Sequence, residues 1–385
     1  MRNVFTFRAA PEITFGAGSV QQLGQKLKNY GVQKILLVVD QGFAQKGPLA
    51  KVTEPLEKEG IKFAVFDRVE PEPRVETADE CGSLAKKEKF DFIIGVGGGS
   101  AMDTAKAAAI LATNEGRAKD YQGLNKVPRP GLPKGMIPTT AGTGSEVTFT
   151  AVFINEAEKK KAGINSPYLF PEIAVLDPEL TLSLPPAVTA YTGMDALAHA
   201  IESFTSLQAN FLSEMFSLEA VRKIMKNLRS AVENGQDLNA RSEMLMGSLL
   251  AGIGLANAGV TAVHSLSYPL GGSFRVPHGV GNGLLLPAVM EYNALSSPGR
   301  FARLAEAMEI EIKGLSVAEA ALRSVEGVKK LAQDIEVPLR LSDLGVPKSA
   351  LPWMAEEALK VVRPLENNPR PISKEDALWI YESVF

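Results

Sequence analysis

Cysteine, histidine and tryptophan are scarce in this chain of 385 residues, which has one cysteine, three histidines and two tryptophans. The single thiol, Cys81, excludes an internal disulfide and a zinc cluster built from cysteines, and it fits a reducing, cytoplasmic compartment. Any site that needs imidazole must use His199, His264 or His278. The scarcity therefore narrows the search for functional residues.

An excess of one charge and long apolar runs are also lacking. The chain has 41 basic and 44 acidic residues and no basic stripe, so nucleic acid and anionic membranes are poor candidates for partners. No stretch reaches the roughly 18 apolar residues of a membrane helix. The N-terminal MRNVFTFRAAPEITFG contains charge and proline, which fits neither a signal peptide nor a membrane anchor. These absences favour a soluble protein.

The first half of the chain alternates strand and helix patterns, whereas the second half is helical throughout. This predicts an α/β domain with a doubly wound, mostly parallel sheet covered on both faces, followed by an all-helical domain. The length favours two domains, and Pro185-Pro186 suits the boundary, so we place them at 1–185 and 186–385. The expected strands are 35–39, 63–66, 92–95, 151–154 and 173–176, and the expected helices are 19–27, 49–59, 78–87, 100–112, 187–205, 212–227, 240–255 and 317–335.

A glycine loop in DFIIGVGGGSAMDTAK is the first candidate for nucleotide binding. An apolar strand leads into Gly97, Gly98 and Gly99, and Ser100 then opens a helix. Glycines let phosphate approach the backbone, and the helix N-terminus offers free N–H groups. Ser100 followed by Asp103 also matches a capping box. Taken alone, the loop fits a tight turn without a ligand equally well.

Two further segments favour a nucleotide. IPTTAGTGSEVT supplies hydroxyl groups at Thr139, Thr140, Thr143 and Ser145. Asp40 ends the run LLVVD, where a carboxylate can accept the ribose hydroxyls of NAD(H) and repel a 2′-phosphate, although a turn residue is the alternative. In the common Rossmann fingerprint the glycine loop precedes the acid by about 20 residues, whereas here it follows the acid. A different doubly wound family is indicated.

The histidines suggest a metal site. Asp195 and His199 are four residues apart in YTGMDALAHAIESF, so they share one helix face. His264 is expected on a helix and His278 in a Pro-His-Gly turn ahead of the next helix. One carboxylate and three imidazoles suit Fe(II) or Zn(II). Asp195 could instead cap a helix, but the placement of all three histidines favours a ligand set.

These motifs, together with DPELTLSLPP, PHG-x-x-N and ENNPRPI, resemble the iron-containing (group III) alcohol dehydrogenase family over nearly the whole chain. Its dehydroquinate synthase-like fold combines an α/β nucleotide domain with a helical metal domain. The resemblance implies an NAD(H)- and iron-dependent alcohol dehydrogenase or aldehyde reductase, with a homo-oligomer of two or more chains. It places the metal ligands at Asp195, His199, His264 and His278, the diphosphate loop at Gly97, Gly98, Gly99, Ser100 and Asp103, the nicotinamide-side and ribose contacts at Thr139, Thr140, Thr143 and Lys161, and the NAD-selecting acid at Asp40.

The sequence departs from the family at two positions. Tyr268 stands where many members have a second histidine four residues after the third ligand, so the proton relay could use the Tyr268 hydroxyl, a ribose hydroxyl of the cofactor or ordered water. Pro71-Glu72-Pro73 replaces a Pro-Asn-Pro turn near the cofactor. Phe149 and Arg275 are candidate substrate contacts, and Arg275 could bind an anionic group or could face solvent.

The predicted function is hydride transfer between NAD(H) and a small alcohol or aldehyde. The alternatives are a reductase for a short anionic aldehyde, a zinc glycerol dehydrogenase-like enzyme, a dehydroquinate synthase-like lyase and a nucleotide sensor without catalysis. The Asp195/His199 pair favours four ligands over the one aspartate and two histidines expected for glycerol dehydrogenase. Apolar and small residues in the motifs disfavour the lyase, which needs many basic groups. The apparently intact ligand set and glycine loop disfavour the sensor.

Overall fold

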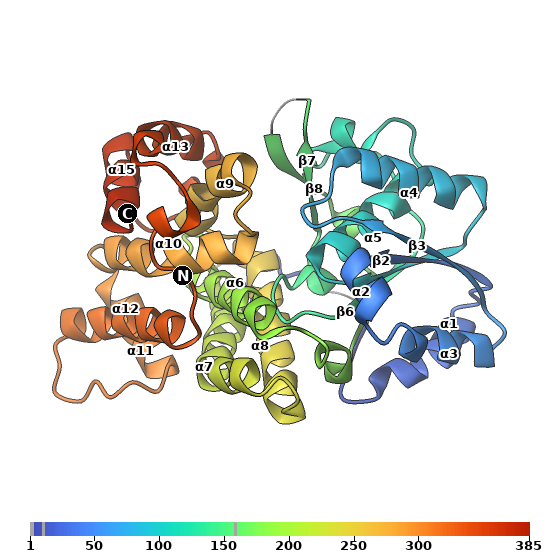
Figure 1. Ribbon diagram of the computed structural model, residues 1–385, viewed down its shortest axis with the longest axis horizontal. Coiled ribbons are helices and arrows are strands. Elements are labelled where there is room, and N and C mark those ends of the chain that lie inside the picture. The colour runs from blue at the N-terminus through green and yellow to red at the C-terminus, as the bar shows by residue number, and fades with distance from the viewer. Residues whose placement is uncertain (1–3, 10–11, 158–159) are drawn as a thin grey trace. The chain divides into compact units, whose positions relative to one another are not determined.

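The computed structural model describes residues 4–9, 12–157 and 160–385 (Figure 1). The chain divides into two compact units. The α/β unit comprises residues 9–140 and 144–184, and the helical unit comprises residues 185–385 together with 141–143 and the segment up to residue 8. A simple division at residue 185 does not anticipate that 141–143 groups with the helices.

The α/β unit contains a six-stranded sheet in which every pairing is parallel. Its strand order is β1 (Glu12–Phe15), β9 (Ile173–Leu176), β6 (Lys134–Pro138), β4 (Phe92–Gly97), β2 (Lys34–Asp40), β3 (Lys62–Val69). Side chains alternate between two buried faces: Ile35 and Leu37 join one apolar cluster, and Leu36 and Val38 join another. The first cluster includes α1 (Leu23–Asn29) and α3 (Ala50–Lys58), and the second includes α4 (Val75–Lys87) and α5 (Gly99–Leu111). The predicted doubly wound sheet is confirmed.

The expected strand at 151–154 forms, but outside this sheet. It is β7 (Thr150–Asn155), which pairs antiparallel with β8 (Lys160–Asn165) in a small sheet that also contains β5 (Gly123–Leu124). The strand β6, with sequence KGMIP, was not among the expected strands, because glycine and proline lower its β-propensity. Its burial between β4 and β9 overrides that local preference.

The parallel order brings three strand ends together. Neighbouring strands β6, β4 and β2 end at Pro138, Gly97 and Asp40. The segments that follow them therefore leave the same edge of the sheet. In open α/β sheets, ligands bind at this carboxyl edge.

The helical unit is built around α6 (Pro186–Thr205), which packs against α7 (Phe211–Glu233), α8 (Leu238–Ala258) and α10 (His278–Ala294). Every α6 residue from 193 to 205 is buried, including Asp195, His199 and Glu202, and such buried polar groups need partners. The other helices are α9 (Ala262–Phe274), α11 (Pro298–Ala307), α12 (Val317–Asp334), α13 (Leu351–Leu359), α14 (Val362–Asn367) and α15 (Lys374–Ser383). Among the described residues no single helix is long and apolar enough to cross a membrane, and α8 and α9 meet that test only as a pair bent by 105°.

Candidate metal and nucleotide sites

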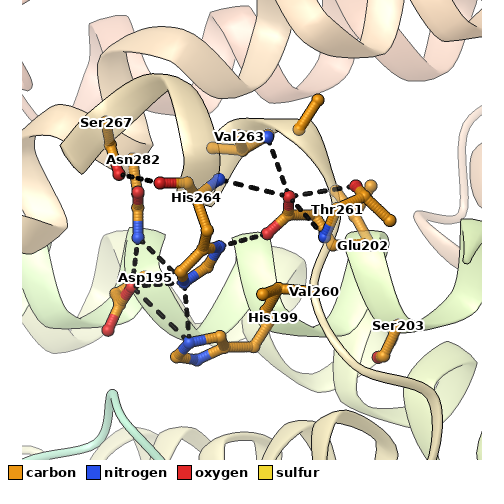
Figure 2. A network of polar contacts seen from close by, with 12 residues as sticks. Asp195, His199, Glu202, Ser203, Val260, Thr261, Val263, His264, Ser267 and Asn282 are labelled. Carbon is orange, nitrogen blue, oxygen red and sulfur yellow. Dashed lines mark hydrogen bonds and ion pairs between the residues drawn. The ribbon is translucent and has the colours of Figure 1, made fainter. Parts of the chain in front are cut away.

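Three helices of the helical unit bring the predicted metal ligands together. Asp195 and His199 lie one turn apart on α6, His264 is the third residue of α9, and His278 is the first residue of α10 rather than part of a preceding turn. Figure 2 shows Asp195, His199 and His264 pointing toward one another. The side chain of His278 reaches the same carboxylate oxygen of Asp195.

The donor atoms of Asp195, His199 and His264 all lie within 4.8 Å of one another, which suits one ion, and His278 approaches the same Asp195 oxygen. Asp195 Oδ1 lies 3.9 Å from His199 Nε2, 4.0 Å from His264 Nε2 and 3.7 Å from His278 Nε2. The Nε2 atoms of His199 and His264 are 3.1 Å apart. Four donors at about 2.1 Å from an ion in a tetrahedron are about 3.4 Å apart. The observed separations lie on both sides of this value.

The hydrogen-bond partners indicate which ring nitrogens carry protons. His199 Nδ1 lies 3.4 Å from the carbonyl oxygen of Gly142, and His264 Nδ1 donates to Glu202 Oε2. Because a carbonyl and a carboxylate only accept, both rings carry their proton on Nδ1 and present an Nε2 lone pair to the site. Two lone pairs facing each other across 3.1 Å repel unless a cation lies between the ligands. The donor set therefore fits a divalent metal.

The electrostatics favour the charge states that bind metal. Burial by itself would raise the pKa of Asp195, but the charges of the three histidines and a hydrogen bond from Asn282 outweigh it and lower that pKa to about 2. Burial also lowers the pKa of His199. At neutral pH the site thus holds an ionised carboxylate and a neutral His199 imidazole.

Two residues near the ligands were not predicted from the sequence. Asn282 Nδ2 donates to Asp195 Oδ1 at 2.7 Å and lies 3.2 Å and 3.1 Å from the Nε2 atoms of His264 and His278. Glu202 accepts the His264 proton. Asn282 lies one turn after His278 and Glu202 one turn after His199, so helical spacing from the ligands could have identified both.

The exposure of the ligands differs. The His278 side chain is 27% exposed, whereas those of Asp195, His199 and His264 are 5%, 7% and 6% exposed. A small molecule could therefore reach the ligand set most easily beside His278. Tyr268, the proposed proton-relay group, lies on α9 one turn after His264 and is partly buried.

In the α/β unit the glycine loop and Asp40 lie in contact. Gly97 has a φ of 149°, and a Cβ there would lie 2.3 Å from Asp40 Oδ2, so only glycine fits. The Asp40 carboxylate accepts from Phe43 N at 2.8 Å, capping α2 (Gln41–Lys46), and from Gly98 N at 3.3 Å. A Cβ on Gly98 would lie 3.6 Å from Thr140. The structure thus brings Asp40, the loop and Thr140 together at the carboxyl edge of the sheet.

The expected capping box between Ser100 and Asp103 is wrong. Gly98 is the N-cap of α5 and no side chain caps this helix. Asp103 instead accepts from Ser145 Oγ at 2.6 Å and from Val152 N at 2.8 Å, because these donors lie beside the first turn of α5. Lys106, which is fully buried, donates to Ser145 Oγ at 2.7 Å. Asp103 and Lys106 therefore tie α5 to the segment after β6, and a diphosphate contact of Asp103 stays a prediction.

The electrostatics of this polar network follow from its burial. Burial raises the pKa of Asp103 and lowers that of Lys106 to about 8. Burial also raises the pKa of the nearby Glu146 to about 7. Asp103, Ser145 and Lys106 have partners and so support the loop, whereas Glu146 Oε1 is buried with no hydrogen-bond partner among the described residues.

Four more of the predicted residues have partners or positions of their own. Lys161 on β8 forms an ion pair with Glu72, which adopts the left-handed conformation with φ 54°. The Phe149 ring packs against Phe170 at 5.4 Å between centroids. Thr143 belongs to the helical unit, and Arg275 is exposed and ends α9 with φ 56°. Their proposed contacts with cofactor and substrate stay predictions.

Comparison with known proteins identifies the class. Residues 10–178 match the iron-containing alcohol dehydrogenase family, and residues 189–385 match the C-terminal domain of the Fe-containing alcohol dehydrogenase family. The chain therefore belongs to the iron-containing alcohol dehydrogenase family. It is an oxidoreductase of the alcohol dehydrogenase and aldehyde reductase type, in a family that uses NAD(H) and iron.

Individual relatives match over nearly their full length. The chain is 42% identical to long-chain-alcohol dehydrogenase 1 of Geobacillus thermodenitrificans, over 96% of this chain and 94% of the relative. The crystal structure of a 1,3-propanediol oxidoreductase has a TM-score of 0.97 at 38% identity and covers 100% of both chains. Sulfoacetaldehyde reductase from Bifidobacterium kashiwanohense, solved in complex with NAD+, has a TM-score of 0.90 at 30% identity, covering 100% of this chain and 99% of that one.

Proposed function

We propose that Asp195, His199, His264 and His278 bind one Fe(II) ion, which Zn(II) could replace, and that this site serves reversible hydride transfer between NAD(H) and a small alcohol or aldehyde. The observation that carries the proposal is the convergence of a carboxylate oxygen and three Nε2 atoms, with the His199 and His264 lone pairs facing each other across 3.1 Å. The close approach of these lone pairs is unfavourable without a cation and becomes favourable when a cation binds between them.

The metal, the cofactor and the protein side chains would each have a separate role in the reaction. When bound, the metal supplies polarisation of the substrate oxygen, and NAD(H) supplies the hydride chemistry. Asp195 contributes one negative charge, so the site retains positive charge for a substrate oxygen. The exposed side of His278 leaves room for that oxygen. Tyr268 is the proposed proton relay, whose hydroxyl takes the alcohol proton as it passes its own proton to water, with the reverse transfer in aldehyde reduction.

Cofactor binding is proposed for the α/β unit. Its supports are the shared carboxyl edge of β2, β4 and β6 and the contact between Asp40 and the glycine loop. The proposed contacts are Gly97, Gly98, Gly99, Ser100 and Asp103 for the diphosphate, Thr139, Thr140, Thr143 and Lys161 for the nicotinamide side and ribose, and Asp40 for the adenosine ribose. We propose the domain roles accordingly, with the nucleotide bound by the α/β unit and the metal by the helical unit.

The substrate proposed is a small alcohol or aldehyde without a charged group. The names of the relatives cover long-chain alcohols, 1,3-propanediol and sulfoacetaldehyde, so similarity alone does not select one substrate. Arg275, on which the anionic alternative depends, is exposed to solvent, and water weakens an ion pair made there. Phe149 is the proposed apolar contact.

We also propose that the enzyme is cytoplasmic and forms a homo-oligomer. Cys81 is buried, and burial raises the pKa of its thiol, which suits a stable reduced form in the cytoplasm. Phe211 and Met215 lie one turn apart on α7 and are 58% and 55% exposed, and Leu207 nearby is 57% exposed. Such an apolar surface supports a homo-oligomer, which light scattering on the purified protein would test.

A substrate panel tests the proposed function. Purified protein loaded anaerobically with Fe(II) is given NADH and aldehydes of increasing length, and then NAD+ and the matching alcohols, with absorbance of NADH as the readout. We expect turnover that disappears in the metal-free protein, and similar or higher kcat/KM for neutral aldehydes than for anionic ones of equal length. Turnover confined to anionic aldehydes would reject the proposed substrate class. No turnover in either direction with any member of the panel would reject the proposed function.

A further inference from the structure

We infer that Glu202 is a positioning residue of the metal site. It holds the ring proton of His264 on Nδ1, which leaves Nε2 for the metal and thereby sets metal affinity. The inference rests on the proposed metal site. Glu202 is 1% exposed and lies on α6, one turn after His199. Figure 2 shows its carboxylate between the start of α9 and the His264 ring.

The two carboxylate oxygens of Glu202 have separate partners. Oε1 accepts from Thr261 N and Thr261 Oγ1 at 3.0 Å each, from Val263 N at 2.9 Å and from His264 N at 3.4 Å. Three of these donors are backbone N–H groups at the N-terminus of α9, and the fourth is the hydroxyl of its N-cap residue Thr261, which provides no side-chain cap. Glu202 therefore caps α9 from a neighbouring helix, and its negative charge suits the helix dipole.

The second oxygen, Oε2, accepts from His264 Nδ1. This bond fixes the proton on Nδ1 and leaves the Nε2 lone pair for the metal. The corresponding partner of His199 is the neutral carbonyl of Gly142, at 3.4 Å. Because a carboxylate is the stronger acceptor, His264 is the more firmly oriented of these two ligands.

The substitution Glu202→Gln isolates this role. The four donors around Oε1 require an oxygen at that place, so the amide nitrogen must take the place of Oε2 and face His264 Nδ1. An amide nitrogen donates, and Nδ1 would then have to accept, which moves the ring proton to Nε2. A protonated Nε2 cannot bind a metal. The cap on α9 would remain, because the other oxygen keeps its donors.

Glu214→Gln is the matched control. Glu214 is also buried, at 3% exposure, and lies on the adjacent helix α7. Its carboxylate binds Arg300 at 2.8 Å and Arg303 at 3.0 Å, away from the ligand set. Loss of these ion pairs in Glu214→Gln should lower the melting temperature and leave the metal affinity unchanged.

The test is a titration of the three metal-free, full-length proteins with Zn(II) in competition with a chromophoric chelator. We expect the Zn(II) affinity of Glu202→Gln to fall roughly 10- to 100-fold, as for other partners of metal-binding histidines, and that of Glu214→Gln to match wild type. Equal affinity in Glu202→Gln and wild type would overturn the inference. Failure of wild type to bind Zn(II) would instead overturn the proposed metal site.

A second measurement identifies the protonated ring nitrogen directly. Because the chain has only three histidines, selective 15N-histidine labelling gives few signals, and long-range 1H–15N spectra report which nitrogen carries the proton. Metal-free wild type should show His264 protonated at Nδ1, and Glu202→Gln should show it protonated at Nε2. Protonation of His264 at Nε2 in metal-free wild type would overturn the inference.

Discussion

The proposed nucleotide site of the α/β unit and the proposed metal site of the helical unit use different kinds of groups. The α/β unit offers mainly backbone, at a glycine loop where a Cβ on Gly97 would lie 2.3 Å from Asp40. The helical unit offers four side chains from α6, α9 and α10. A backbone site depends on the shape of a loop, whereas a side-chain site depends on each residue separately. We therefore expect single substitutions to weaken nucleotide binding gradually and to abolish metal binding.

The largest effect is expected from removing a metal ligand. His264→Ala or His278→Ala should lose bound metal and nearly all turnover, by more than the roughly 10- to 100-fold that outer-shell changes cost. Metal analysis and NADH oxidation measure both losses, and binding of NAD+ by calorimetry should be unchanged. Full activity in metal-stripped His278→Ala would contradict this contrast between the units, because turnover would then not depend on a metal held by side chains of the helical unit.

The glycine loop should show a graded response. Gly97→Ala should raise the KM for NAD+ by about tenfold or more and lower the melting temperature, since a strained backbone costs about 1–3 kcal/mol. Gly98→Ala is the control, because its Cβ would meet only Thr140 at an ordinary 3.6 Å. It should keep the melting temperature and still weaken NAD+ binding if diphosphate lies against Gly98. Unchanged KM values in both variants would place the cofactor elsewhere.

Asp40 should affect the choice of cofactor. Wild type should prefer NADH to NADPH, because the Asp40 charge opposes a 2′-phosphate. Asp40→Asn should reduce the preference for NADH over NADPH severalfold. It should keep the melting temperature, because asparagine can still cap α2. Asp40→Gly should reduce the preference as well but lose the side-chain bonds to Phe43 and Gly98. A wild type that uses NADPH better than NADH would contradict the assignment.

The last prediction concerns the pH dependence of stability, and no effect on turnover is expected from it. Burial raises the pKa of Glu146 from an ordinary 4.5 to about 7, so the folded state favours the neutral acid. Its contribution to stability is present below pH 4.5 and is lost as pH rises through about 7, a cost of up to about 3 kcal/mol. Glu146→Gln should therefore melt higher than wild type at pH 8.5, with a smaller difference at pH 5. A difference independent of pH would contradict this account.

The main sheet and the clustering of the four proposed ligands could be predicted from the sequence, and the reasons also explain which features were missed. Strands such as 35–39 are recognisable because both faces are buried and the residues are β-branched or aliphatic. The strand β6, with its glycine and proline, and the antiparallel pairing of β7 depend on tertiary contacts that no local pattern contains.

The clustering of the proposed ligands was predictable because histidine is rare and the helical spacing is regular. Glu202 and Asn282 were missed, since a buried glutamate and an asparagine on helices have many ordinary roles. Helical spacing marks both positions, but their roles become clear once α6, α9 and α10 bring them to His264 and Asp195. Asp103 was misassigned as a capping residue because the sequence does not show that Ser145 and Val152 lie beside α5.

The most direct test of the central claim is an anaerobic titration of metal-free protein with Fe(II), in which bound iron and NADH-dependent aldehyde reduction are followed together. The four-ligand site predicts that both rise in parallel and saturate at one iron per chain. Full turnover before any metal is added, or one bound iron per chain with no turnover, would contradict the claim.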